Sequence, residues 1–180
     1  MGFALAFVTL AVATRKCGTE EPSAELIAAS NKVMTNFMAT SDFKTEARVV
    51  PTYFHVLRSG TAVSEGNIPD SSLYKQLDVL NADYTPTGIS FKLLGITRTT
   101  SSAWYNGQND ADMKTTLRRG DYGTLNVYFH NMQGGDLGFC YYPKANPSSA
   151  TIRTDGCSIR STTVPGGSAT NYNLGRTLTQ

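Results

Sequence analysis

Apolar residues recur along this chain with two different periods, and each period predicts its own kind of element. A spacing of three to four residues, typical of helices, predicts helices over 22–43, 70–84 and 110–119. Alternation of apolar and polar residues predicts strands over 49–57, 89–93 and 125–129, and a short fourth strand over 137–142 at a sheet edge. After the first helix, the order strand, helix, strand, helix, strand, strand predicts an α/β (α+β) fold with a twisted sheet of mixed direction and a backing helix.

The N-terminus begins with an apolar run that has the length of a signal-peptide core. Residues 3–13 carry no charge and end in Ala11-Val12-Ala13, the small-x-small pattern that signal peptidase needs. A buried N-terminal strand is the alternative interpretation. The chain has 23 threonines and 15 serines but only 17% charged residues, a composition closer to that of extracellular proteins. We therefore expect a signal peptide over 1–13 and a secreted protein.

Net charge and hydropathy argue against two classes of partner. Sixteen Lys and Arg residues against 14 Asp and Glu residues leave a net charge of +2, too small for a nucleic-acid-binding surface. No apolar run approaches the roughly 20 residues that span a bilayer. We expect no nucleic acid and no membrane as a partner, and we expect a monomer.

The chain has three cysteines, so one is left over if the other two pair. Cys140 and Cys157 are 17 residues apart and flank a loop rich in Pro, Asn and Ser, which makes them natural disulfide partners. Closing such a loop would stabilise the fold by roughly 3 kcal/mol. Cys17 then remains, either as an incidental free thiol or as the partner of a cysteine in another molecule.

The residues alone do not supply a complete catalytic set. His55 and His130 are the only histidines, each sits in an alternating strand, and no His-x-x-x-His pair is present, so we interpret both as structural. The chain contains no G-x-S-x-G, P-loop or G-x-G-x-x-G motif. Trp104-Tyr105-Asn106-Gly107 would suit a carbohydrate-binding loop, although a lone aromatic residue more often serves packing.

Five stretches of the sequence carry a resemblance to a known family. They are 15–19 (RKCGT), 53–56 (YFHV), 79–84 with 88–91 (VLNADY and GISF), 137–141 (LGFCY) and 164–175 (VPGGSATNYNLG). Together they resemble the fungal extracellular metalloproteases of the pappalysin family, a branch of the metzincin zinc proteases. The last stretch is highly specific, and the similarity covers nearly the whole chain from Cys17 onward.

The resemblance implies a secreted zinc metalloendopeptidase made as a proenzyme. Residues 14–47 would be a prosegment in which Cys17 ligates the catalytic zinc and blocks its water, and residues 48–180 would be part of the catalytic domain. The edge strand Leu137, Gly138, Phe139, Cys140 and Tyr141 would pair with an extended protein or peptide substrate. The same strand could instead be an edge twisted by its disulfide.

The sequence departs from the family at its end. In the family, the motif H-E-x-x-H-x-x-G-x-x-H follows this stretch directly, and Gln180 stands where its first histidine belongs. We therefore expect a truncated N-terminal subdomain without its active-site helix, poorly folded alone, with no catalytic residue, no zinc ligand in its mature part and no zinc bound. An unspliced intron would explain a glutamine followed by a stop. The alternative function is a non-enzymatic secreted decoy or binding module.

Overall fold

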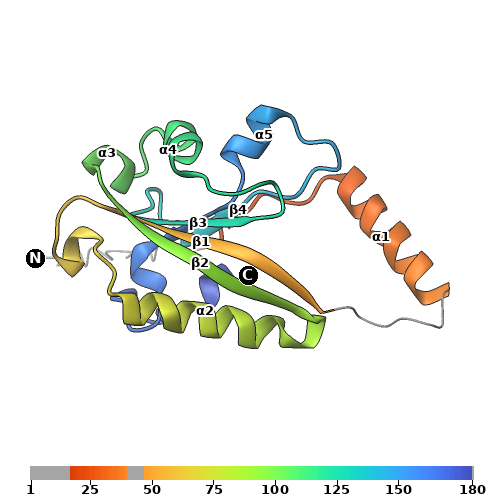
Figure 1. The fold of residues 1–180 in the computed structure, drawn as a ribbon, viewed down its shortest axis with the longest axis horizontal. Helices are drawn as coiled ribbons and strands as arrows, with labels where there is room; N and C mark the ends of the chain where they lie inside the picture. Colours follow the sequence, from red (N-terminus) through yellow and green to blue (C-terminus); the bar gives the residue numbers. More distant parts are fainter. Residues whose placement is uncertain (1–16, 40–46, 180) are drawn as a thin grey trace, which may run out of the picture.

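A five-stranded sheet forms the centre of the molecule (Figure 1). The structure is a computed structural model that describes residues 17–39 and 47–179. The strands are β1 (Arg48–Arg58), β2 (Ile89–Thr100), β3 (Leu125–His130), β4 (Gly138–Cys140) and β5 (Cys157–Arg160). They lie in the order β2-β1-β3-β5-β4. Strands β2, β1, β3 and β5 run parallel to one another, and β4 runs antiparallel to β5. The predicted α/β fold with a sheet of mixed direction is confirmed.

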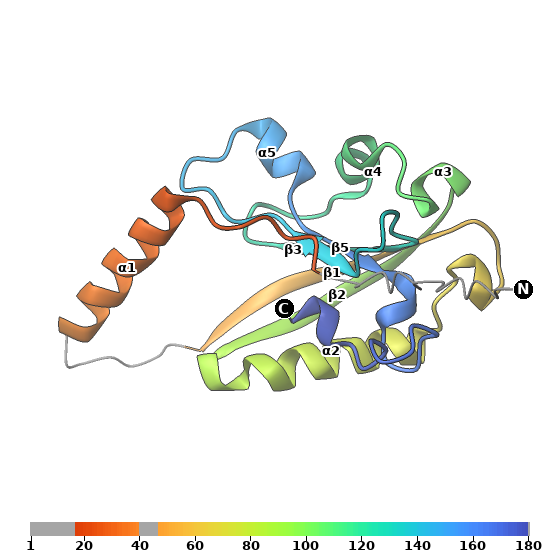
Figure 2. The same cartoon turned by 180° about the vertical axis from the view of Figure 1, so that it is seen from behind.

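Helices cover both faces of the sheet. The long helix α2 (Asp70–Tyr84) lies along one face, and the short helices α3 (Ser102–Tyr105), α4 (Asp110–Leu117) and α5 (Ser149–Thr154) lie over the other (Figures 1 and 2). The N-terminal helix α1 (Ala24–Ala39) stands away from this body (Figure 1). Helix α2 is thus the backing helix that the sequence predicts.

Each face of the sheet has its own core, because alternate residues of a strand point to opposite faces. Phe54, Val56 and Phe129 pack toward α2 in the larger cluster, which Leu73 completes. The smaller cluster, beneath α3 and α4, consists of Leu57, Met113, Leu117 and Tyr128, with Trp104 packed against it. Strand β1 is buried on both faces in its second half, as expected of a parallel strand inside a sheet.

The structure differs from the predicted elements in three places. Strand β2 continues to Thr100, beyond the predicted end at residue 93, and α5 and β5 lie where the sequence predicts no element. Near the end of the described residues the chain forms a single 3₁₀ turn, η4 (Arg176–Leu178). Leu174 and Leu178 do not share a face there, because Leu178 is buried and Leu174 is 69% exposed.

Some expectations fall outside the described residues. These are the signal peptide over 1–13, the start of the prosegment at 14, part of the stretch between α1 and β1, and Gln180 at the position of the first zinc histidine. Within residues 17–39 and 47–179, no helix is long and apolar enough to cross a bilayer.

Candidate functional site

Strand β4 is the edge of the sheet, and its open side carries the candidate site. On its inner side, the Arg160 N–H donates to the Leu137 carbonyl (2.8 Å) and the Tyr141 N–H donates to the Gly156 carbonyl (3.4 Å). Backbone groups along a strand point alternately to its two sides, so those of Gly138 and Cys140 point away from β5. These two residues present the backbone groups that an added strand would use.

A disulfide fixes the end of the edge strand. Cys140 and Cys157 lie opposite each other in the β4–β5 register and are joined, while Cys17 is a free, exposed cysteine. The β4 strand is only three residues long, so the covalent link and the backbone pairing together hold it in place.

Lys114 supports the edge strand from the side of helix α4. Its side chain is fully buried, and its Nζ lies 4.7 Å from the ring centre of Phe139 and 4.6 Å from that of Tyr141. The Asp110 carboxylate lies 3.1 Å from the same Nζ. Burial lowers the pKa of Lys114, and the Asp110 charge opposes that shift. A buried cation thus joins α4 to two aromatic side chains of the candidate strand.

Tight packing beneath Gly138 brings the C-terminal segment close to the edge strand. A Cβ at Gly138 would lie 2.8 Å from Cδ1 of Ile159 and 3.1 Å from Cγ2 of Thr177, so the position has no room for a side chain. Gln76 of α2 holds the same segment by donating a hydrogen bond from Nε2 to the Gly175 carbonyl (2.8 Å). The last described residues therefore pass directly under the edge strand.

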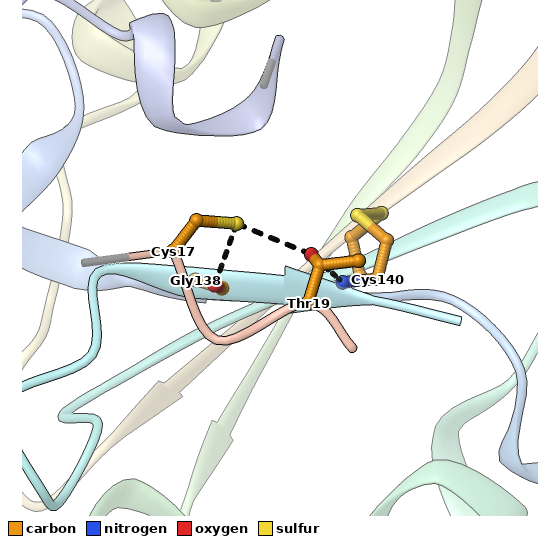
Figure 3. The surroundings of a disulfide bond; sticks show 5 residues. Cys17, Thr19, Gly138 and Cys140 are labelled. Atoms are coloured by element: carbon orange, nitrogen blue, oxygen red, sulfur yellow. Dashed lines mark hydrogen bonds between the residues drawn. A yellow bond between two sulfur atoms is a disulfide. The ribbon is translucent and has the colours of Figure 1, made fainter. Parts of the chain in front are cut away.

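Residues 17–19 lie on the open side of β4 (Figure 3). The Gly18 N–H donates to the Gly138 carbonyl (2.8 Å), and the Cys140 N–H donates to Oγ1 of Thr19 (3.2 Å). The Cys17 thiol lies 3.6 Å from the Gly138 carbonyl oxygen and 3.2 Å from Oγ1 of Thr19. The segment runs parallel to β4, because Cys17 is next to Gly138 and Thr19 is next to Cys140.

Gly18 lies close to the Asp136 side chain. A Cβ at Gly18 would lie 2.9 Å from Oδ2 of Asp136, so that carboxylate would have to shift to admit a side chain. Next to the strand, Glu20, Leu26, Tyr141 and Lys144 are among the residues that line a hollow of about 420 Å³. The N-terminal segment therefore follows the edge strand beyond Thr19.

The two histidines lie inside the sheet, away from the open edge. His55 Nε2 lies 2.9 Å from Oδ1 of Asn126, and Nδ1 lies 2.8 Å from Oγ1 of Thr97. The Arg119 N–H also donates to Oδ1 of Asn126, so that oxygen is an acceptor and Nε2 of His55 carries the proton. Burial lowers the pKa of His55 to about 4, although the Asn126 hydrogen bond opposes the shift.

His130 is buried without such partners. Neither ring nitrogen has a hydrogen-bond partner among the described residues, and burial lowers its pKa to about 4. The nearby Asp110 charge acts in the opposite direction. Both histidines are therefore neutral at pH 7.

The described residues do not fit a catalytic zinc. No group of three or more His, Cys, Asp or Glu side chains that could hold a metal occurs in residues 17–39 and 47–179. A catalytic zinc site needs three protein ligands, and here Cys17 stands without a second or third ligand.

The structure brings together most of the site residues that the sequence singles out. Cys17 lies against Gly138, and the disulfide cysteines lie at the end of the same strand. Trp104 packs against the smaller core rather than standing out from a loop. Sequence reasoning missed Thr19 and Lys114, because their contacts with β4 join distant parts of the chain and leave no local pattern.

The sequence is similar to curated proteins named extracellular metalloprotease. It is 48% identical over 168 residues to that of Colletotrichum graminicola, covering 91% of this chain and 60% of the relative. It is 51% identical over 142 residues to that of Arthroderma otae, covering 78% of this chain and 51% of the relative. No protein-family model matches the chain. The chain spans about three fifths or less of the length of these relatives.

The fold is also similar to that of a solved structure. A mutant of promirolysin from Tannerella forsythia superposes with a TM-score of 0.64 at 22% identity, covering 92% of this chain and 66% of that one. At this identity the likeness concerns the fold. The edge strand, the sheet and the helix that backs it thus belong to a fold that is already known.

Proposed function

We propose that this chain is the N-terminal part of a secreted zinc metalloendopeptidase of the pappalysin branch of the metzincins, in a latent arrangement. Residues 14–47 are the prosegment and residues 48–180 are part of the catalytic domain. The strand 137–141 is the edge along which an extended protein or peptide substrate would pair. Cys17 is the prosegment ligand that would block the zinc of the complete enzyme.

The observation that carries this proposal is the hydrogen bond from the Gly18 N–H to the Gly138 carbonyl. It places Cys17 on the open edge strand, where a bound substrate strand would otherwise form the same backbone bond. A Cβ at Gly138 would lie 3.1 Å from Cγ2 of Thr177, so the edge strand also adjoins the last described residues. In the family, the zinc-binding motif follows these residues directly. The relatives' names and the shared fold support the same conclusion.

The proposal includes inactivity of the 180-residue chain itself. A zinc ion would need ligands beyond those of the described residues. We expect the purified chain to leave casein and gelatin intact in the presence of zinc. Zinc-dependent cleavage that a chelator abolishes would contradict this part of the proposal.

The family assignment is tested at the level of the gene. Reading the genomic DNA beyond codon 180 should show a splice acceptor a short distance downstream, followed in frame by Glu-x-x-His. Such a frame would encode the first histidine of the H-E-x-x-H motif together with its general base. A locus without that frame would overturn the enzyme assignment in favour of a non-enzymatic secreted binding module.

A further inference from the structure

Thr19 is the residue on which the contact between the N-terminal segment and the edge strand depends. Its Oγ1 accepts the Cys140 N–H at 3.2 Å and lies 3.2 Å from the Cys17 Sγ, which donates to it. A threonine hydroxyl can accept two hydrogen bonds, so one oxygen serves both groups. Figure 3 shows this oxygen between the thiol and the Cys140 amide nitrogen.

The Thr19 hydroxyl replaces a backbone group of a regular ladder. In a parallel pair, a residue that donates to one residue of the neighbouring strand accepts from the residue two positions further along. Gly18 donates to Gly138, so the Cys140 N–H would be expected to donate to the Gly18 carbonyl. It donates to the Thr19 side chain instead. The ladder therefore has one backbone bond and is completed by a hydroxyl.

The remaining contacts of the segment with β4 are few. They are the Gly18 backbone bond and the long contact of 3.6 Å between the Cys17 thiol and the Gly138 carbonyl oxygen. A thiol is a weak donor and has one hydrogen to share between its two neighbours. Removing the hydroxyl would leave the Cys140 N–H, which points away from β5, without its acceptor.

We propose that Thr19 is a positioning residue that closes the open edge of the sheet and aims the Cys17 thiol at Gly138. The proposal rests on the proposed function, in which the same edge receives substrate. Its hydroxyl makes the edge unavailable to another strand and orients the thiol through a single oxygen atom. The methyl group of Thr19 has no part in this role.

The test is amide hydrogen exchange of the full 180-residue chain, measured by NMR at the Gly18 and Cys140 amides. Thr19→Val keeps the shape of the side chain and removes the acceptor. We expect both amides to exchange about fivefold faster in Thr19→Val, the change in an equilibrium constant that follows the loss of one typical hydrogen bond. Thr19→Ser keeps the hydroxyl and should exchange within about twofold of the wild type.

Amides of the central strands, at Phe54 and Phe129, report on folding and should stay protected in both variants. Unchanged Gly18 and Cys140 exchange in Thr19→Val would overturn the role of Thr19 and leave the proposed function standing. Equal acceleration in Thr19→Val and Thr19→Ser would also overturn it, because the hydroxyl would not be the cause. An unprotected Gly18 amide in the wild type would instead remove the observation that carries the proposed function.

Discussion

The two edges of the sheet are closed in opposite ways. At the long edge strand β2, Asn81 of helix α2 accepts a hydrogen bond from the Phe91 N–H (2.7 Å) and donates one to the Phe91 carbonyl (3.1 Å). Asn81 precedes Phe91 by only ten residues. At the short edge strand β4, the cover is the segment 17–19, which precedes Cys140 by more than a hundred residues.

The difference lies in what must move to expose each edge. Helix α2 also contributes Leu73 and Leu80 to the larger core, so the Asn81 side chain cannot move away from Phe91 without disturbing that core. Segment 17–19 contributes no residue to either core cluster of the described residues. At Phe91 the β2 edge is therefore covered as firmly as the fold itself, whereas the β4 edge has a cover that can leave while the body stays folded.

Loss of the disulfide is the largest effect that we expect at the β4 edge. The double variant Cys140→Ala/Cys157→Ala should lose about 3 kcal/mol of unfolding free energy, since the bridge closes a loop of this size in the unfolded chain. Urea unfolding followed by circular dichroism measures it. Cys17→Ala is the control, because the free, exposed thiol should matter by less than about 0.5 kcal/mol. Equal midpoints for the double variant and the wild type would show that β4 needs no covalent link.

Loss of the buried Lys114 cation, on the α4 side of β4, is the second largest effect that we expect. Lys114→Met keeps a long apolar side chain but leaves Asp110 without its ion pair and removes the attraction to the Phe139 and Tyr141 rings. We expect a loss of about 2 kcal/mol, less than for a fully buried pair because the Asp110 side chain is 31% exposed. Lys75→Met, on the exposed side of α2, is the matched control. A variant as stable as this control would mean that apolar packing alone holds the strand.

Acid should weaken both halves of the sheet through one histidine each. His55 bonds to Thr97 of β2, and His130 lies in β3 beside β5. Their folded-state pKa values of about 4 lie below the ordinary 6.5, so the unfolded chain binds more protons between these values. Stability is therefore complete above pH 6.5 and declines as the pH falls toward 4. Each histidine should lower the free energy of unfolding by about 1.5 kcal/mol between pH 6.5 and pH 5.

The variant His130→Phe separates the two contributions. It should lose about half as much unfolding free energy as the wild type over this pH range, because only His55 still titrates. Urea titrations at pH 6.5 and pH 5 measure the difference. The same acid loss in His130→Phe and the wild type would show that His130 is not kept neutral by the fold.

The smallest effect that we expect is the loss of the two Asn81–Phe91 hydrogen bonds at the β2 edge. Asn81→Ala removes both hydrogen bonds to Phe91 and should cost about 1 kcal/mol, because the freed backbone groups lie at an edge that water can reach. Exposed Asn31 in α1 offers a matched control for the loss of an amide side chain. Light scattering at high concentration adds a second readout, since an open edge strand favours association. Unchanged stability and scattering would show that β2 does not depend on the Asn81 hydrogen bonds.

The central strands could be predicted from the sequence because they are continuous or alternating apolar runs. Strand β5 could not, since its Ser158 and Arg160 are polar, and Ser158 is buried only because β3 and β4 lie on either side of it. Helix α5 lies in a stretch of Ser and Thr that also suits a loop, and Ser148 begins it by accepting the Thr151 N–H. Both elements depend on neighbours that are distant in the sequence.

The candidate site was predictable only in its individual parts. The alternation around Phe139 predicts a short edge strand, and the family resemblance singles out that strand and Cys17. The sequence does not predict that Thr19 completes the ladder, or that Lys114 packs against the strand from the α4 side. Each is a contact across the fold by a residue type that is ordinarily solvent-exposed.

The cover of the β4 edge is attached to the body through the chain between Thr19 and Arg48. An attached segment competes for its site at an effective concentration on the order of millimolar, so a contact of one backbone bond and one hydroxyl can keep the edge occupied. A single backbone cut within that stretch would make the contact bimolecular. At the micromolar concentrations of a dilute protein, the same bonds would then hold only a small fraction of molecules. Occupancy of the edge is thus decided by chain connectivity more than by contact strength.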